Sequence, residues 1–569
     1  MDHRATFALW QEKLAGTEWE AQLKAMENDE EAIRNAFSGW VEFGTAGMRG
    51  VLGPGPGQLN VFTVRRATQG LAAYINSIGQ ADRGVAIAYD SRHNSALFAK
   101  ETALTLAANG VKALLYPEYT SVPQLSFTIL HLNAAAGVVI TASHNPSKYN
   151  GYKVYGPDGG QLANEGADAV LSFIDPIEDC FSLPTMDEQA ALDAGLLQYL
   201  GPELDDAYVA AVKKQCPEPQ ALRDFGRELK LVYTPLNGTG MRSVPRVLHE
   251  LGLENVHIVK EQMAPDGDFP TVSAPNPEMP EAFDLSRKLA DTVGADLLLA
   301  TDPDCDRLGV ALREPGGGFL TLTGNQIGCL LMDYLLSHTE IKPGDFVVRS
   351  LVSTPMADRI AASYGVECRS VLTGFKYIAE QIRLAEESGK GRFLFGFEES
   401  YGFLAGTYCR DKDACLAAEL AASAASFWAR QGKDLHQALE ELYLRHGYFA
   451  EKVVSFTREG ADGIAQIKQA VAQLRQDPPQ EVCGSPVLAV RDYQTKQRRD
   501  AEGKVTPIDL PASNIIYLEL NEGSLIFRPS GTEPKLKTYI SVSGASEDAA
   551  KARLTEVTAA AKDTVDALL

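Results

Sequence analysis

The sequence predicts an α/β protein of four domains: three α/β domains with mixed, mainly parallel sheets, and a C-terminal α+β domain. Apolar, strand-like runs alternate with helix-like runs three times along the chain, which is typical of β-α-β units. Near the C-terminus, two strand-like runs are separated only by Asn521, Glu522 and Gly523, which predicts an antiparallel hairpin. With 569 residues, the chain is also too long for a single hydrophobic core.

Each of the first three domains is expected to hold several strands with helices between them. The predicted strands are residues 85–89, 111–116, 135–140, 229–233, 256–259, 296–300, 346–349, 368–372 and 393–395. The predicted helices are residues 96–108, 242–251 and 355–364. The last domain is expected to hold strands 515–520, 524–527 and 536–542 and a helix from residue 546 onward. Breaks rich in Pro and Gly favour domains at residues 1–200, 201–318, 319–446 and 447–569.

Composition limits the class of partner. The formal net charge of −22 argues against nucleic acid and against an anionic membrane surface. It leaves room for a small anionic substrate bound by local Arg and Lys clusters. We expect no signal peptide and no membrane helix, because no run of about 18 apolar residues is present. The eight cysteines show no C-x-x-C spacing, which favours reduced thiols and a cytoplasmic location.

The most informative segment is residues 141–146, Thr-Ala-Ser-His-Asn-Pro. It places the hydroxyl of Ser143 on a tight turn directly after a predicted strand, at the sheet edge where open α/β sheets bind ligands. Lys153 follows closely and could neutralise a phosphate at that hydroxyl. Arg49, in a Gly-rich segment at residues 44–50, is a second candidate cation. An ordinary surface arginine is the alternative there.

Three carboxylates alternate in residues 302–307, Asp-Pro-Asp-Cys-Asp-Arg, after another predicted strand. Asp302, Asp304 and Asp306 could converge on one hard divalent cation, and an open coordination face suits Mg²⁺. An EF-hand does not fit, because Arg307 and Arg313 occupy its Gly and Glu positions. A solvated acidic turn is the alternative.

A third loop carries groups that could bind a sugar. Residues 396–402 present Glu398 and Ser400 between glycines, where both side chains could bond neighbouring sugar hydroxyls. Nearby, residues 373–376 place a lysine two residues after a glycine, following a predicted strand. A plain surface loop is the alternative for both segments.

A fourth loop, residues 528–533, fits a phosphate. It combines the guanidinium of Arg528, the hydroxyls of Ser530 and Thr532, and a backbone N–H exposed by Gly531. Such groups favour a phosphate dianion. A simple hairpin turn is the alternative.

The motifs give no support to several other chemistries. Neither a G-x-x-x-x-G-K-[ST] segment nor a strand-linked G-x-G-x-x-G segment is present, so we do not expect a nucleotide or dinucleotide site. The nine histidines show no zinc-binding spacing. His144 is adjacent to Ser143, and because adjacent residues rarely form a nucleophile–base pair, we do not expect an acyl-transfer triad.

Together, a nucleophilic serine, a hard metal, a sugar-binding loop and a phosphate-binding loop predict phosphoryl transfer on a sugar phosphate. With these four motifs in this order, nearly the whole chain resembles the α-D-phosphohexomutase superfamily of phosphoglucomutases and phosphomannomutases. Residues 44–49, 149–153 and 373–376 are most similar to its longer bacterial phosphoglucomutase branch, which is also similar to animal phosphopentomutases.

The resemblance implies four domains around a deep central cleft, each contributing one loop. It implies that Ser143 carries a phosphate, and that one Mg²⁺ binds the three aspartates and an oxygen of the phosphoserine. The catalytic residues it implies are Ser143, Lys153, Arg49 and His144. The substrate-binding residues it implies are Thr373, Gly374, Lys376, Glu398, Ser400, Arg307, Arg528, Ser530, Gly531 and Thr532.

The implied activity is the interconversion of α-D-glucose 1-phosphate and glucose 6-phosphate, with glucose 1,6-bisphosphate as intermediate and activator. Phosphopentomutase and phosphomannomutase activities are alternatives, because several sugars share the hydroxyls that the sugar loop would contact. A Mg²⁺-dependent sugar-phosphate phosphatase and a non-catalytic sugar-phosphate sensor are alternatives from other classes. The sequence leaves the oligomeric state open between monomer and dimer.

Overall fold

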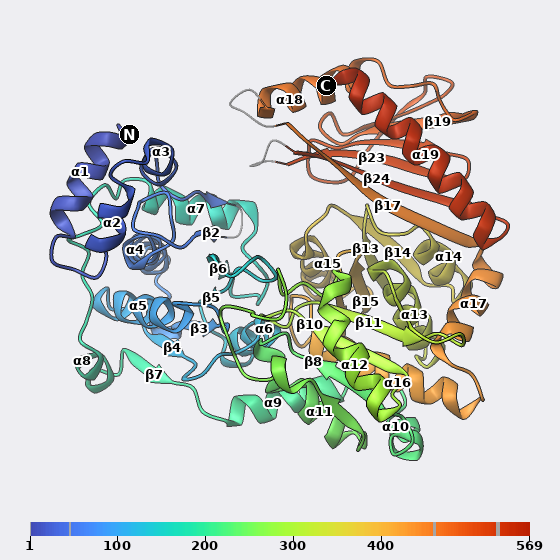
Figure 1. Ribbon diagram of the computed structural model, residues 1–569, viewed down its shortest axis with the longest axis horizontal. Coiled ribbons are helices and arrows are strands. Elements are labelled where there is room, and N and C mark those ends of the chain that lie inside the picture. The colour runs from blue at the N-terminus through green and yellow to red at the C-terminus, as the bar shows by residue number, and fades with distance from the viewer. Residues whose placement is uncertain (1, 45–46, 459–462, 531–534) are drawn as a thin grey trace.

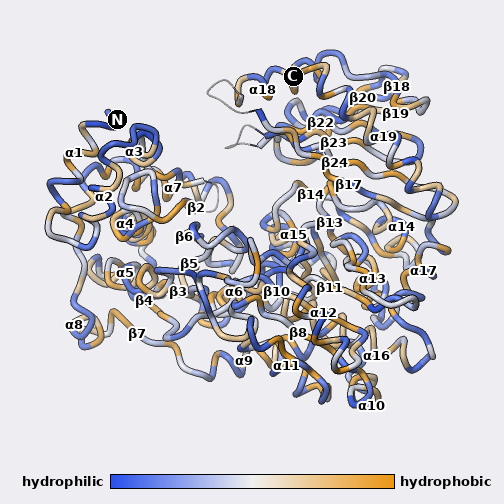
Figure 2. The backbone as a smooth tube through the Cα atoms, viewed as in Figure 1, coloured by the Kyte–Doolittle hydropathy of each residue, from blue (hydrophilic) through white to orange (hydrophobic). Residues whose placement is uncertain are grey.

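The computed structural model describes residues 2–44, 47–458, 463–530 and 535–569, which form four β-sheets with helices packed around them (Figure 1). Three sheets are mixed and the fourth is antiparallel, which confirms the predicted fold class. Hydrophobic residues recur along the strands and along the helices that cover them (Figure 2). The predicted domain boundaries stay a prediction.

The first sheet has seven strands in the order β1-β2-β6-β5-β3-β4-β7. They are β1 (Phe43–Gly44), β2 (Gly47–Val51), β3 (Val85–Tyr89), β4 (Ala113–Leu115), β5 (Ala136–Ile140), β6 (Tyr149–Tyr155) and β7 (Leu197–Tyr199). Strands β5, β3, β4 and β7 run parallel, whereas β6, β2 and β1 add an antiparallel edge. This edge was not predicted, and it carries two of the candidate cations.

Helices cover both faces of the first sheet because its central strands are apolar on both sides. Val85 and Ile87 pack in one apolar cluster, whereas Ala86 and Ala88 pack in another on the opposite face. The helices of this part are α1 (His3–Lys13), α2 (Glu20–Met26), α3 (Glu30–Phe37), α4 (Val61–Ser77), α5 (Ser95–Ala108), α6 (Val122–Leu132), α7 (Asn164–Ile174) and α8 (Glu188–Asp193).

The second sheet has five strands in the order β12-β11-β10-β8-β9, parallel between β10, β8 and β9 and antiparallel at β11 and β12. They are β8 (Leu231–Thr234), β9 (Val256–Ile258), β10 (Leu297–Thr301), β11 (Leu308–Arg313) and β12 (Phe319–Thr321). Its helices are α9 (Glu203–Lys213), α10 (Pro219–Phe225), α11 (Val244–Glu250) and α12 (Asp284–Val293).

The third sheet has four strands in the order β14-β13-β15-β16, of which β14, β13 and β15 are parallel. They are β13 (Phe346–Ser350), β14 (Glu367–Val371), β15 (Phe393–Glu398) and β16 (Gly402–Ala405). Its helices are α13 (Gly324–Ser337), α14 (Met356–Ser363), α15 (Phe375–Ser388), α16 (Ala414–Arg430) and α17 (Leu435–His446).

One apolar core runs through the second and third sheets. Leu299 of β10, Phe395 of β15 and Leu416 of α16 all belong to the same cluster of buried side chains. The almost fully buried helix α16 packs against β11 as well as β16. The two domains are therefore held together by a shared core.

The fourth sheet is antiparallel and lies above the third domain in Figure 1. Its strands are β17 (Tyr448–Thr457), β18 (Glu481–Val482), β19 (Ser485–Asp492), β20 (Gln497–Asp500), β21 (Val505–Pro507), β22 (Ile516–Leu520), β23 (Gly523–Pro529) and β24 (Lys535–Gly544). Its helices are α18 (Gly463–Gln476) and α19 (Glu547–Leu568). In the part of the chain that the structure describes, no helix is both long and apolar enough to span a bilayer.

Candidate functional site

Ser143 lies on a strained turn directly after β5. Its backbone has φ +52°, in the left-handed region that a residue with a Cβ adopts only at a cost. Its N–H donates to the hydroxyl of Thr141 at 2.8 Å, which closes the turn. The side chain is almost buried, at 4% exposure. The turn therefore presents one hydroxyl in a fixed direction from the edge of the first sheet.

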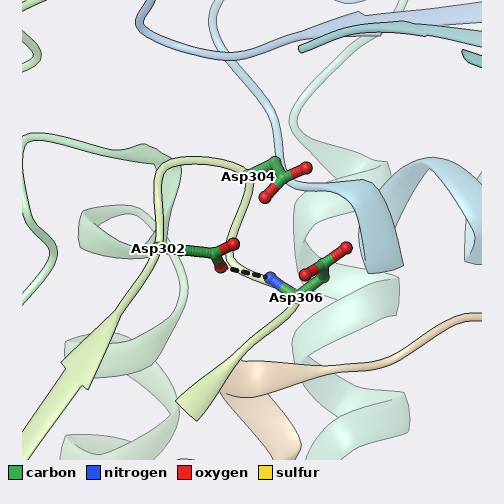
Figure 3. A group of neighbouring side chains, drawn as sticks. All are labelled: Asp302, Asp304 and Asp306. Carbon is green, nitrogen blue, oxygen red and sulfur yellow. Dashed lines mark hydrogen bonds between the residues drawn. The ribbon is translucent and has the colours of Figure 1, made fainter. Parts of the chain in front are cut away.

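Asp302, Asp304 and Asp306 lie on the turn between β10 and β11, and their carboxylates face one another (Figure 3). Asp302 Oδ1 accepts hydrogen bonds from the backbone N–H groups of Asp306 at 3.1 Å and Arg307 at 3.0 Å. Cys305, between them, has φ +56°. Its N–H donates to the carbonyl oxygen of Asp302, so the tight turn brings alternate side chains to one side.

The three carboxylates fit a divalent cation. One oxygen of each lies within 4.8 Å of the others, and all three side chains are buried. Asp304 Oδ1 and Asp306 Oδ1 have no hydrogen-bond partner among the described residues, and a buried oxygen without a partner is costly. Hard oxygen ligands of this kind suit Mg²⁺ or Ca²⁺ better than softer metals.

Electrostatics around the three aspartates show how crowded the negative charge is. Burial, together with the neighbouring charges of Asp304 and Asp306, raises the pKa of Asp302 well above its usual range. Burial and the charge of Asp304 also raise the pKa of Asp306. Burial alone would raise the pKa of Asp304, but Lys153 and a hydrogen bond with Asp302 hold it below its ordinary value.

The first two loops meet directly. The hydroxyl of Ser143 donates to Asp302 Oδ2 at 2.9 Å, so the candidate nucleophile touches the candidate metal site. The backbone N–H of Val122, at the start of α6, donates to the carbonyl oxygen of Asp304 at 3.0 Å. These contacts join the first and second domains at the site.

Cations surround the carboxylates. Lys153, on β6, donates from Nζ to Asp304 Oδ2 at 3.0 Å. Lys412, just before α16, lies with Nζ 3.0 Å from Asp306 Oδ2. Arg49, on β2, is exposed and donates from Nη1 to Asn145 Oδ1 at 3.2 Å. Two of the three were predicted, and all three border the same space.

That space is a cavity of about 180 Å³ beside Ser143. Positive side chains dominate its lining, which suits a phosphate. Its lining residues are Gly47, Met48, Arg49, Ser143, Lys153, Gln161, Asp306, Arg307 and Lys412. Arg307 is held at its edge by Glu278, with Nη1 2.5 Å from Oε1.

His144 lies next to the candidate nucleophile. Its Nδ1 lies 3.1 Å from the hydroxyl of Ser143, although adjacent residues rarely pair in this way. The left-handed turn at Ser143 is what folds the two side chains together. Burial and the charges of Arg307 and Arg49 lower the pKa of His144 to about 2, so the imidazole is neutral. Among the residues that the structure describes, no carboxylate bonds this ring, so the arrangement lacks the third member of a triad.

The third loop lies beside the carboxylate loop, because the carbonyl oxygen of Tyr401 accepts the backbone N–H of Leu308 at 3.0 Å. Glu398, the last residue of β15, accepts a hydrogen bond from the backbone N–H of Gly374 at 2.7 Å. Burial and the charge of Glu399 raise the pKa of Glu398 to about 7, against the opposing charges of Lys412 and Arg307. Lys412 and Arg307 both line the Ser143 cavity, and their electrostatic effect on Glu398 indicates that Glu398 lies near the carboxylate loop.

The other residues predicted in the third domain lie at different positions around Glu398. Thr373 precedes Gly374, and its hydroxyl oxygen is buried without a hydrogen-bond partner among the described residues. Ser400 is half-buried in the turn after β15. Lys376 instead donates from Nζ to Asn164 Oδ1 of the first domain at 2.8 Å. The contact between Lys376 and Asn164 ties the third domain to the first.

The fourth loop is described only in part. Arg528 is near the end of β23 and Ser530 follows it, both half-buried, whereas Gly531 and Thr532 lie outside the described residues. Burial and the charge of Glu399 raise the pKa of Tyr539, and the nearby charge of Arg528 opposes this rise. Tyr539 also packs with Leu372 in an apolar cluster. The described part of this loop therefore lies beside the third-domain loop.

Family models match most of the chain. Models of the phosphoglucomutase/phosphomannomutase alpha/beta/alpha domains I, II and III match residues 41–179, 206–317 and 323–446. The phosphoglucomutase of Staphylococcus epidermidis (RP62A) is 40% identical over 523 residues, covering 91% of this chain and 92% of its own. The phosphoglucomutase of Staphylococcus aureus (MRSA252) is 37% identical over 514 residues, covering 90% of this chain and 91% of its own.

The chain belongs to the α-D-phosphohexomutase superfamily. It is accordingly an enzyme of the phosphoglucomutase type, an isomerase that acts as an intramolecular phosphotransferase.

Solved structures share the phosphohexomutase fold. A phosphoglucomutase/phosphomannomutase family protein from Burkholderia thailandensis aligns with a TM-score of 0.66 at 18% identity, covering 92% of this chain and 97% of its own. The open form of the Paramecium phosphoglucomutase parafusin aligns with a TM-score of 0.68 at 15% identity, covering 92% and 94%. At these identities the likeness concerns the fold alone.

Sequence reasoning missed several residues of this phosphohexomutase site. Lys412 is buried between Asp306 and Asp411, and their charges raise its pKa against the effect of burial. Asp411 also accepts from the hydroxyl of Tyr155 at 2.7 Å and from Gln161 Nε2 at 2.9 Å. The alternating charges of residues 410–413 were a usable signal, since they directly precede the N-terminus of a buried helix.

Proposed function

We propose that this phosphohexomutase interconverts α-D-glucose 1-phosphate and glucose 6-phosphate, with Ser143 as the carrier of the phosphate in transit. Glucose 1,6-bisphosphate is the intermediate and activator. The observation that carries the proposal is the contact between the hydroxyl of Ser143 and Asp302 at 2.9 Å, inside a buried group of three carboxylates. The curated relatives at about 40% identity over most of the chain are named phosphoglucomutases, which supports glucose as the sugar.

Asp302, Asp304 and Asp306 are proposed to hold one Mg²⁺ per chain, with an oxygen of phosphorylated Ser143 as a further ligand. Asp304 Oδ1 and Asp306 Oδ1, which are buried without a hydrogen-bond partner in the described part of the chain, support this role. When bound, the ion would withdraw charge from the phosphate and make it a better phosphoryl donor.

The proposed transfer moves the phosphoryl group from Ser143 to a sugar hydroxyl. The bond between phosphorus and Oγ of Ser143 breaks while a bond forms between phosphorus and a sugar hydroxyl oxygen. The sugar hydroxyl loses one proton, and Oγ of Ser143 gains one. Lys153 is the group we assign to this proton exchange, and Arg49 faces the transferring phosphate with its charge. Their place in the lining of the Ser143 cavity supports both roles. The reverse transfer, from the other end of the bisphosphate, restores phosphoserine.

Other residues would hold the substrate. Glu398, Ser400 and Thr373 would bind sugar hydroxyls, and the backbone N–H of Gly374 would fix the direction of Glu398. The phosphate that is not in transit would be bound by Arg528, Ser530, Gly531 and Thr532. The remaining proposed contacts are Arg307 and His144 beside the transferring phosphate, and Lys376 at the rim between the first and third domains.

The sugar phosphate is the only partner we propose, in line with the strong net negative charge of the chain. A cytoplasmic location is supported by the eight cysteines, all of which are free thiols.

A substrate panel tests the proposal. Turnover of glucose, mannose, ribose and N-acetylglucosamine 1-phosphates is measured with and without glucose 1,6-bisphosphate, together with release of inorganic phosphate. We expect the highest kcat/KM for glucose 1-phosphate, activation by the bisphosphate and no stoichiometric phosphate release. A preference of about a hundredfold for ribose 1-phosphate would replace the substrate assignment, and stoichiometric phosphate release would indicate a phosphatase.

Substitution of Ser143 tests its role separately. Ser143→Ala is expected to lose turnover while substrate binding largely survives, because only the phosphate carrier is removed. Ser172→Ala, an exposed serine on α7, is the matched control and should keep full activity. Full activity of Ser143→Ala would refute the role of Ser143.

A further inference from the structure

A buried arginine lies directly behind the Ser143 turn. Arg92, on the loop after β3, donates from its guanidinium to the backbone carbonyl oxygens of Ser143 at 2.5 Å, Pro146 at 3.0 Å and Tyr149 at 3.1 Å, and also to that of Asn145. One side chain thus gathers four carbonyl groups of residues 143–149. The five donors of a guanidinium form a rigid planar fork, which can hold several acceptors in fixed directions.

Asp90 holds this arginine in place. Its Oδ2 lies 3.3 Å from Arg92 Nε, and both side chains are fully buried. Its Oδ1 accepts from the backbone N–H of Arg92 at 2.9 Å and from the hydroxyl of Ser95 at 2.8 Å. The ring of Phe269, from the second domain, covers the guanidinium at 5.0 Å.

Thr141 connects Asp90, the partner of Arg92, to the backbone N–H of Ser143. The hydroxyl of Thr141 donates to Asp90 Oδ2 at 2.7 Å and lies 3.2 Å from Asp304 Oδ2. Its oxygen accepts the backbone N–H of Ser143 at 2.8 Å. The turn is therefore held at its N–H by Thr141 and at its carbonyl oxygens by Arg92.

The turn needs such support because its conformation is unfavourable. Ser143 sits at φ +52°, which persists only where surrounding contacts determine it. A buried ion pair is weak as a source of stability, because desolvation offsets most of the attraction. The pair of Arg92 and Asp90 is better explained by the geometry that it imposes on Ser143.

We propose that Arg92, oriented by Asp90, is a positioning residue for phosphoryl transfer at Ser143, with Thr141 as the link to the carboxylate loop. The proposal rests on the proposed function, in which Ser143 carries the phosphate. Among the described residues, the guanidinium of Arg92 donates hydrogen bonds to backbone oxygens of residues 143–149, pairs with Asp90 and packs under the ring of Phe269. Its loss should therefore alter the direction of the Ser143 side chain and leave the substrate-binding groups in place.

The test compares Arg92→Lys with Arg66→Lys. Arg66 is a matched control, because it is also buried (7% against 3% exposure) and donates to a backbone carbonyl, that of Ile177 at 2.9 Å. We expect Arg92→Lys to lose about a hundredfold in kcat with KM for glucose 1-phosphate within about threefold, since a small misplacement of the reacting atoms costs this much. Arg66→Lys should keep both values. A kcat for Arg92→Lys within about threefold of the parent enzyme would overturn the proposal.

Counting the phosphorylated enzyme distinguishes a loss of folded protein from a slower phosphoryl transfer. Activity is expressed per phosphorylated Ser143, counted by intact-mass spectrometry, so that a loss of folded enzyme alone would leave kcat unchanged. If Arg92→Lys does not fold, Thr141→Val decides instead. We expect Thr141→Val to lose about tenfold or more in kcat and Thr141→Ser to regain most of it. Equal kcat for the valine variant and the parent would overturn the proposal.

Failure of the positioning role and failure of the proposed function give different results. An inactive Ser143→Ala with a fully active Arg92→Lys refutes only the positioning role. A fully active Ser143→Ala refutes the phosphate carrier, on which the positioning role depends.

Discussion

At the scale of single residues, three non-glycine residues in left-handed backbone mark the three loops that converge. Ser143, Cys305 and Tyr401 have φ of +52°, +56° and +67°. Each one turns the chain sharply after a strand, and Tyr401 accepts the N–H of Leu308 through its carbonyl oxygen. Such strain persists where neighbours over-determine it, and it clusters at active sites. Here it directs a hydroxyl and the carboxylates toward one place.

Loss of one carboxylate should weaken metal binding and lower activity together. For Asp306→Asn we expect kcat/KM to fall about a hundredfold or more, because metal-assisted charge stabilisation is lost. Calorimetry should show weaker Mg²⁺ binding, and a chelator should inactivate the parent enzyme until Mg²⁺ is restored. Asp563→Asn, an exposed residue of α19, is the control. An Asp306→Asn variant that binds Mg²⁺ as tightly as the parent would contradict the metal assignment.

The pKa of Glu398 predicts a pH dependence of substrate use. Burial raises this pKa to about 7, so the carboxylate form that accepts bonds from sugar hydroxyls becomes dominant only above that pH. We expect kcat/KM at pH 6 to be roughly tenfold below the value at pH 8. Glu398→Gln is the control, because its side chain cannot ionise. Its pH profile therefore shows the titration of the substrate phosphate under the same conditions. If the parent enzyme and this variant gave parallel pH profiles, Glu398 would not be the titrating group.

At the scale of elements, strand ends position the chemistry. Strands β5, β10 and β15 each run into one of the converging loops, as expected for the carboxyl edge of parallel strands. The antiparallel strands β2 and β6 then bring Arg49 and Lys153 back toward that edge. Helix α16 starts beside the site, next to Lys412, and continues into the core shared by the second and third domains.

Helix α16 also carries a buried acid whose titration should affect stability. Glu419 is fully buried, and neither carboxyl oxygen has a hydrogen-bond partner within the described ranges. Burial raises its pKa from 4.5 to about 8, although the Cys216 thiol opposes this. The folded state therefore keeps a proton that the unfolded chain loses. Stability from this group is complete below pH 4.5 and is lost as the pH rises to about 8.

Calorimetric melting of Glu419→Gln tests the predicted loss of stability with rising pH. The slope attributable to one such carboxyl is about 1.4 kcal/mol per pH unit. We expect the Tm of the glutamine variant to exceed that of the parent at pH 8, with a margin that shrinks toward pH 5. Glu31→Gln, an exposed residue of α3, should show no such trend. A margin independent of pH would mean that Glu419 is ionised throughout.

At the scale of the whole molecule, the described loops come together because the domains share contacts near the site. The second and third domains share one core, and the carboxylate loop bonds Ser143 and Val122 of the first domain. Lys376 reaches Asn164 across the first and third domains. The site is therefore a product of the assembled chain, and no single domain contains it.

Much of this assembly followed from local patterns in the sequence. The apolar runs predicted the central parallel strands, and the hairpin signal at residues 521–523 agrees with the turn between β22 and β23. The antiparallel strand β6 was not predicted, because its residues look like part of a polar turn and pair only with distant strands. Lys412 and Arg92 were missed for the same reason: their partners, Asp306 and the 143–149 carbonyls, are far away in the sequence.

Following a phosphate through Ser143 tests the proposed phosphoryl transfer directly. Enzyme labelled by incubation with radioactive glucose 1,6-bisphosphate is digested, the phosphorylated peptide is identified by mass spectrometry, and excess glucose 1-phosphate is added to the intact labelled enzyme. We expect one phosphoryl group on the peptide that contains Ser143, and we expect its transfer to sugar to be at least as fast as steady-state turnover. Turnover by an enzyme with no phosphate on Ser143, or with a label that stays on the protein, would contradict the proposed transfer.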